Sequence, residues 1–167
     1  MVVRSFPRRT RGLGLVELLV ATAIGAGLLA ALVSVARQGV QARSQTRDVG
    51  EALQQARFAL ERVAAAARAT APHGAPTPAA NTSGDWFSPI RFCLNGAQAL
   101  VETTTADAGC TGTQVVAERV SAFVLTPSTD GGALAAESAT VAVTVAGPGG
   151  GGEVTLSERL RLGGGQL

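Results

Sequence analysis

Few residues of this 167-residue chain could carry acid–base, nucleophilic or metal chemistry. The single histidine, His73, lies in a Pro-rich segment with no acid or serine in helical or strand register. All 14 basic residues are arginine, which excludes a Walker phosphate loop and lysine-based covalent chemistry. Two cysteines and one distant histidine are too few for a zinc centre. We therefore expect no enzyme active site, no metal and no cofactor.

A glycine-rich run at residues 147–152, GPGGGG, has the GxGxxG spacing of a dinucleotide-binding loop. That loop requires a helix after the glycines, because the helix N-terminus binds the pyrophosphate. In this chain the strand-like sequence EVTL follows instead. The run is therefore predicted to be a flexible hairpin loop.

The two cysteines, Cys93 and Cys110, lie in the C-terminal half of the chain. If this half is outside the cytoplasm, a disulfide between them is expected. It would close a short loop and add about 3 kcal/mol to the free energy of unfolding in the entropic model. The alternative is a pair of free, buried thiols.

The longest apolar run, residues 13–36, contains one charged residue, Glu17. As a helix this run is about 36 Å long, enough to cross a hydrocarbon core of about 30 Å. Core helices of soluble proteins are rarely apolar on all faces over such a length, so we expect a transmembrane helix. A carboxylate raises the free energy of membrane insertion by about 2.5–3.5 kcal/mol near the centre of such a run, and by less near an end. Glu17 therefore either has a functional partner or lies near the interface, stabilised by the helix dipole.

The residues before the apolar run carry positive charge only. Residues 1–12 contain no acid and four arginines: Arg4, Arg8, Arg9 and Arg11. The positive-inside rule then predicts a cytoplasmic N-terminus, one span of the cytoplasmic membrane and an extracytoplasmic remainder. Loss of residues 1–12 would change the net charge from +2 to −2, because they carry +4. We therefore expect no specific nucleic-acid partner.

The junction between these two segments, RGLGLVELLVA at residues 11–21, resembles the class III signal of type IV prepilins. In that family a short basic leader ends in Gly, cleavage follows, and Glu is the fifth residue of the mature chain. Here Gly12 precedes the cut, Leu13 becomes the first mature residue and Glu17 the fifth. Most members have Phe and then Thr or Ser where this chain has Leu13 and Gly14. A secretory signal peptide is cut after its apolar run, whereas here the run is retained.

The resemblance implies a set of roles and partners. A prepilin peptidase cleaves between Gly12 and Leu13, and the new N-terminus of Leu13 is N-methylated. Glu17 pairs with the N-terminal ammonium of a neighbouring subunit inside an apolar bundle, which offsets the cost of burial and fixes the axial register. The partners are other major and minor pilins, which bind through the N-terminal helix, and an inner-membrane assembly platform.

Residues 37–71 are expected to continue the helix as an amphipathic half that Pro72 ends. Small and apolar residues recur there at steps of three and four: Ala42, Thr46, Val49, Leu53, Ala56, Leu60, Val63 and Ala67. We expect this stripe to pack against the chain's own sheet. A self-associating coiled coil is the alternative, although Ala and Thr are weak seam residues.

A linker at residues 72–85 and a C-terminal β-domain at residues 86–167 complete the expected organisation. The predicted strands are 86–94, 98–102, 114–118, 119–126, 140–146 and 153–162. Val141, Val143 and Val145 alternate with smaller residues, as in a half-buried strand, and Trp86 and Phe87 are expected to anchor the core. A long helix followed by a small, mainly antiparallel sheet is an α+β fold, and the resemblance implies that it is pilin-like.

The expected function is that of a minor pilin, a structural subunit that primes, caps or modulates assembly of a type IV pilus. The stretches EALQQARFALERVAAAAR at residues 51–68 and ERLRL at residues 158–162 resemble PilW-type minor pilins. A minor pseudopilin of type II secretion, of the J type, shares both features and is the first alternative. A competence pseudopilus is the next. A membrane-anchored enzyme, from a different class, would need an acid–base cluster that the sequence lacks.

Overall fold

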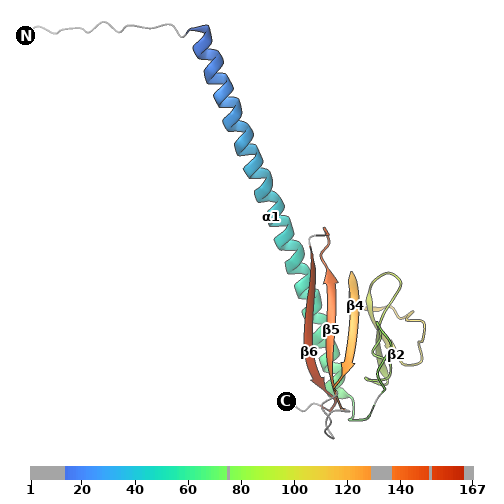
Figure 1. The fold of residues 1–167 in the computed structure, drawn as a ribbon. Coiled ribbons are helices and arrows are strands. Elements are labelled where there is room, and N and C mark those ends of the chain that lie inside the picture. Colours follow the sequence, from blue (N-terminus) through green and yellow to red (C-terminus); the bar gives the residue numbers. More distant parts are fainter. Residues whose placement is uncertain (1–13, 75, 129–136, 151, 164–167) are drawn as a thin grey trace, which may run out of the picture. The chain divides into compact units, whose positions relative to one another are not determined.

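The computed structural model describes residues 14–163 apart from residue 75, residues 129–136 and residue 151 (Figure 1). The chain divides into two compact units, residues 1–42 and residues 43–167. Within the described residues one long helix precedes six strands, so the fold class is α+β. The expected order of elements is confirmed.

Helix α1 runs from Leu15 to Ala69. Its first turn forms on the carbonyl of Gly14, which accepts the backbone N–H groups of Glu17 at 2.9 Å and Leu18 at 3.1 Å. The helix ends two residues earlier than expected, and Pro72 follows shortly afterwards, where a helix cannot continue. By length and composition, α1 contains one segment that is apolar and long enough to cross a membrane.

The buried face of α1 lies entirely in its C-terminal part. The helix residues that are buried are Ala52, Ala56, Ala59, Leu60, Val63, Ala64, Ala66 and Ala67. The predicted stripe is therefore correct from Ala56 onward and wrong before it: Ala42, Thr46 and Val49 are exposed, and Leu53 is half-buried. Six of these eight residues are alanine, so α1 contributes mainly short side chains to the core.

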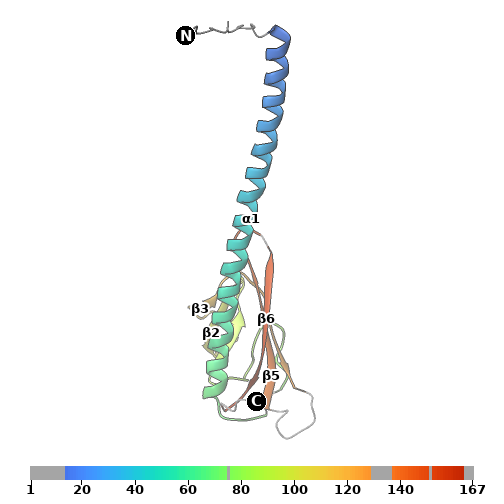
Figure 2. The same cartoon turned by 90° about the vertical axis from the view of Figure 1, so that its left-hand side faces the viewer.

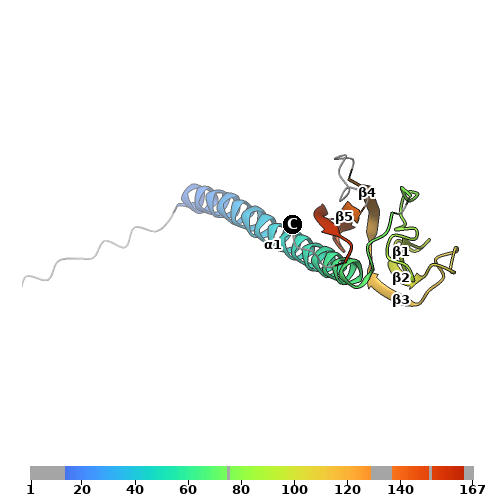
Figure 3. The ribbon, with the colours of Figure 1, turned by 90° about the horizontal axis from the view of Figure 1, so that it is seen from below.

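The strands form two three-stranded antiparallel sheets, not the single sheet expected from the sequence. The first has the order β1-β2-β3 and the second β4-β5-β6. Their bounds are Ile90–Leu94 (β1), Leu100–Thr104 (β2), Gln114–Ala117 (β3), Val120–Pro127 (β4), Ser138–Ala146 (β5) and Glu153–Arg161 (β6). Seen from below, the second sheet lies next to the C-terminal part of α1, and the first sheet follows beyond β4 (Figure 3).

A short segment at residues 81–83, inside the expected linker, lies between the two sheets. On one side, the N–H of Asn81 donates to the carbonyl of Phe123 in β4 at 3.1 Å. On the other side, the N–H of Leu94 in β1 donates to the carbonyl of Asn81 at 2.9 Å, and that of Ser83 donates to the carbonyl of Phe92 at 2.8 Å. The segment therefore covers the free edges of β1 and β4 and separates the sheets.

The core joins α1 to both sheets in one cluster of buried side chains. Figure 2 shows the C-terminal part of α1 running alongside the strands. In β5 the predicted alternation is confirmed, because Val141, Val143 and Val145 are fully buried. The prediction that Trp86 and Phe87 anchor the core is also confirmed, with exposed fractions of 1% and 2%. Their placement in a strand was wrong: β1 begins only at Ile90, because the preceding residues form turns.

Candidate functional site

Glu17 is the third residue of α1 and lies in its first turn. This position brings its carboxylate close to the unpaired N–H groups of the helix start, where the dipole favours negative charge. The side chain is exposed, and it has no ion pair or hydrogen-bond partner among the described residues. Both interpretations of Glu17, a dipole-stabilised end residue and half of an intermolecular pair, are compatible with this location.

The helix surface that follows Glu17 is apolar on every side. Residues 18–36 carry no charge, and Arg37 is the next charged residue. Along a helix, Glu17 and Arg37 are therefore about 30 Å apart, which matches the thickness of a hydrocarbon core. The hydroxyl of Thr22 donates to the carbonyl of Leu19 at 2.9 Å, so this polar group is paired within the helix itself.

The remaining residues of the expected processing site lie outside the described residues. These are Gly12 and Leu13 at the cleavage position and the leader arginines Arg4, Arg8, Arg9 and Arg11. Their roles remain predictions from the sequence.

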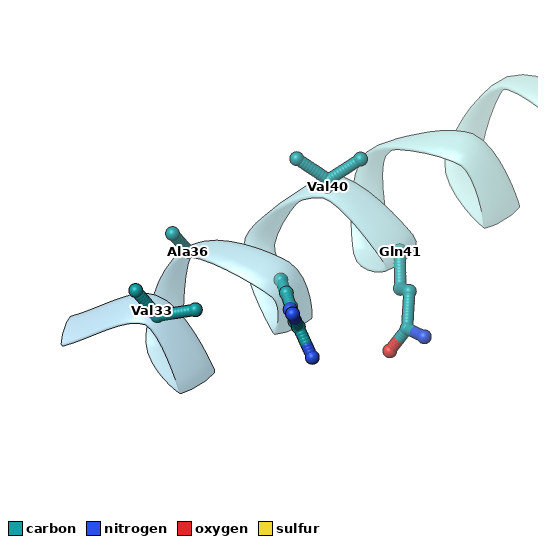
Figure 4. Close-up of a pocket in the computed structure, with 5 residues that line it drawn as sticks. Val33, Ala36, Val40 and Gln41 are labelled. Carbon is teal, nitrogen blue, oxygen red and sulfur yellow. The ribbon is translucent and has the colours of Figure 1, made fainter. Parts of the chain in front are cut away.

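A hollow of about 410 Å³ lies on α1 near the end of the apolar run (Figure 4). Val33, Ala36 and Val40 form its apolar side, and Arg37 and Gln41 complete the lining. All five residues are exposed on the one helix. Its lining contains a single charged group and no acid–base pair, so the hollow lacks the residues of a catalytic site.

The structure joins Cys93 and Cys110 by a disulfide, in agreement with the sequence-based expectation. Asp107, which the sequence analysis did not single out, organises the loop that carries Cys110. Its Oδ2 accepts the hydroxyl of Thr103 at 2.9 Å and the N–H groups of Thr111 at 2.8 Å and Gly112 at 3.0 Å. The pKa of the Asp107 carboxyl is lowered, and the Thr103 hydrogen bond is the largest cause. Desolvation is the second-largest effect and opposes the shift, whereas the hydrogen bonds from Gly112 and Thr111 add to it.

A second missed feature links α1 to the first sheet. The Nε and Nη2 atoms of Arg62 donate to the two carboxylate oxygens of Glu102 in β2, both at 2.6 Å. Glu102 is only 8% exposed, whereas the Arg62 side chain is 42% exposed. This two-point geometry fixes the orientation of β2 against the helix. Because the partners are 40 residues apart, no local spacing in the sequence indicates the pair.

The other candidate groups do not converge. His73 is half-buried, and its Nδ1 lies 2.9 Å from the carbonyl of Ala71. Within the part of the chain that the structure describes, no three His, Cys, Asp or Glu side chains are grouped so as to hold a metal ion. The run at residues 147–152 connects β5 to β6, as predicted for a hairpin loop.

No family model, no curated protein and no solved structure matches this chain.

Proposed function

We propose that the chain is the precursor of a pilin-like structural subunit, and in particular a minor pilin of a type IV pilus. The observation that carries the proposal is the combination of Glu17, which has no partner in the described chain, with an apolar helix surface that the chain leaves uncovered. The buried residues of α1 all lie at Ala52 and beyond. A surface of this kind requires a membrane or a bundle of similar helices around it, because water solvates it poorly.

In the first step of this proposal, the helix is inserted in the membrane. With Glu17 at the inner boundary of the hydrocarbon core and Arg37 at the outer boundary, both charges stay close to water. The leader arginines hold the N-terminus in the cytoplasm until a prepilin peptidase cuts after Gly12. Cleavage replaces the leader by the ammonium of Leu13, four residues before Glu17 in the same chain.

In the second step, the helix joins a bundle of similar helices in the fibre. When the helix leaves the lipid for the centre of a fibre, a carboxylate without a partner would be costly to bury. The Leu13 ammonium of a neighbouring subunit supplies the opposite charge and fixes the axial position of one subunit against the next. The unit at residues 43–167 remains outside the membrane as a folded domain. The Cys93–Cys110 disulfide suits that compartment.

The proposal is tested by replacing Glu17 in cells that assemble the fibre. Glu17→Ala and Glu17→Gln should leave cleavage and membrane insertion intact, because neither process needs the carboxylate. Both variants should be missing from sheared surface fibres, since neither side chain can balance the ammonium of a neighbour. Immunoblots of sheared fibres and of membrane fractions provide the measurement.

A role of Glu17 as a helix-end residue gives a different result. Both variants would then enter fibres at the wild-type level, with a loss of helix stability of about 0.3–1 kcal/mol. Absence of the wild-type protein from pilus fibres, together with its recovery from a secretion pseudopilus, would reject the assignment to a pilus.

A further inference from the structure

The hairpin between β1 and β2 turns at residues 95–99 and begins with the pair Asn95 and Gly96. Gly96 is exposed, and a Cβ added there would meet no atom within 4 Å. Among the described residues, nothing accepts a hydrogen bond from its N–H. The side chain of Asn95, in contrast, is fixed: its Oδ1 accepts the N–H groups of Ala97 and Ala99, both at 3.0 Å.

This geometry suits an intramolecular reaction of the Asn95 amide. The backbone nitrogen of Gly96 loses its proton to hydroxide and attacks Cγ of Asn95, which closes a cyclic imide. The bond from Cγ to Nδ2 breaks, and Nδ2 leaves as ammonia after it takes a proton from water. A second water molecule hydrolyses the imide to aspartate or isoaspartate, so the sequence of steps needs water and no other reactant.

The fold contributes to the first step in two ways. The attacking nitrogen belongs to a glycine, so no side chain hinders its approach to Cγ. The N–H groups of Ala97 and Ala99 point at the oxygen on which negative charge develops, as the donors of an oxyanion hole do. They also hold the side chain in one orientation, which reduces the number of rotamers that the amide samples before the attack.

We infer that Asn95 is a modification site, at which the folded protein converts its own amide to a carboxylate without an enzyme. The reaction adds one negative charge to the tip of the β1–β2 hairpin. This inference is independent of the proposed pilus function, because it depends only on the hairpin.

The other asparagine of the chain, Asn81, lacks this arrangement. Its Oδ1 accepts one N–H, that of Phe123 at 3.2 Å, in place of two. The residue that follows is Thr82, whose branched side chain crowds the attacking nitrogen. Asn81 is therefore an internal control within the same molecule.

The hairpin also discriminates between the two products. An aspartate at residue 95 keeps an oxygen at the same place, and as a charged acceptor it strengthens both N–H hydrogen bonds. Isoaspartate carries an extra methylene in the main chain, which moves the carboxylate away from these donors. We therefore expect Asn95→Asp to fold with a melting temperature equal to or above that of the wild type.

The test uses the full-length protein in detergent micelles, incubated in mildly alkaline buffer with and without urea. Tandem mass spectrometry of digested samples follows the conversion of amide to acid at Asn95 and at Asn81. In the native protein, Asn95 should convert at least as fast as in the urea-unfolded chain, and Asn81 should stay unchanged. Gly96→Ala should slow the conversion severalfold without altering thermal unfolding, because the added Cβ enters open space but crowds the attacking nitrogen.

Two results would overturn the inference. One is an Asn95 amide that persists in the native protein while the unfolded chain converts, because the hairpin would then protect the residue. The other is an unchanged conversion rate in Gly96→Ala, because the attack would then not come from this nitrogen.

Discussion

Asp107 and Glu17 are both carboxylates at ordered positions, yet their surroundings differ completely. Asp107 accepts four hydrogen bonds from its own chain, including one from the Thr111 hydroxyl to Oδ1 at 3.2 Å. Glu17 accepts none from the described residues. A carboxylate that accepts several hydrogen bonds from its own loop stabilises the conformation of that loop. One that lies at the start of an uncovered apolar helix must find its partner in solvent, at the membrane surface or in another molecule.

Asp107→Asn should lower the melting temperature of the domain at neutral pH. The pKa of Asp107 is lower in the folded protein than its unfolded value of about 3.9, because the Thr103 hydroxyl and the two N–H groups stabilise the charged form. This stabilisation is complete above the unfolded pKa and disappears as the pH falls through the folded one. The gap between wild type and variant should therefore narrow below about pH 4, as thermal unfolding followed by circular dichroism across pH can measure.

Asp85→Asn is the matched control for this experiment. Asp85 is 66% exposed and forms a single 3.4 Å ion pair with Arg91, so its loss should change stability little at any pH. Equal effects of the two variants would show that Asp107 has no special role in its loop.

Some of these single-residue features could be predicted from the sequence, and others could not. The disulfide could be predicted because a chain with two cysteines allows one pairing. The Asp107 network and the Arg62–Glu102 pair could not, because each depends on how a loop or strand returns to a distant segment. A hydrogen-bonded carboxylate and a solvated one look the same in a sequence.

Among the elements, α1 shows what the periodicity of apolar residues can predict about burial. The stripe at steps of three and four residues extends over the whole amphipathic half, but the structure buries only its members from Ala56 onward. The spacing identifies a face of the helix, whereas the ends of the sheets decide which turns of that face are covered. The short side chains Ala52, Ala59, Ala64 and Ala66 were missed because alanine is only weakly apolar and carries little periodic signal.

The hairpin between β5 and β6 approaches α1 so closely that its first glycine is required. A Cβ on Gly147 would lie 3.0 Å from the Cβ of Asp48 and 3.2 Å from its carbonyl oxygen. Because these are fixed atoms of a helix, Gly147→Ala should cost about 1–3 kcal/mol of unfolding free energy. Urea denaturation would measure the loss.

Gly149→Ala provides the comparison within the same loop. The atom nearest to its added Cβ is a carboxylate oxygen of Asp48, which can rotate away at the end of its side chain. Its cost should be smaller than that of Gly147→Ala. A Gly147→Ala protein as stable as the wild type would mean that the hairpin does not rest on the helix in solution.

For the molecule as a whole, the α+β order and five of the six strand positions followed from the sequence to within about two residues. The division into two sheets did not, because it depends on Asn81 and its neighbours, which occupy the edges of β1 and β4. A Pro-rich segment is predicted to be a linker from its composition, whether or not its backbone groups form hydrogen bonds with a sheet. The division of the chain into residues 1–42 and 43–167 likewise reflects contacts that composition does not reveal.

The central claim, that this chain is a prepilin-like precursor, is tested most directly by the mass of its mature form. Full-length protein produced together with a prepilin peptidase should lose residues 1–12 and begin at Leu13. Gly12→Val should remain uncut under the same conditions, because a branched side chain then lies beside the scissile bond. Intact-mass spectrometry of the two membrane-extracted proteins reports both outcomes in one measurement. A wild-type protein that keeps residues 1–12, or one cut after the apolar run, would contradict the account.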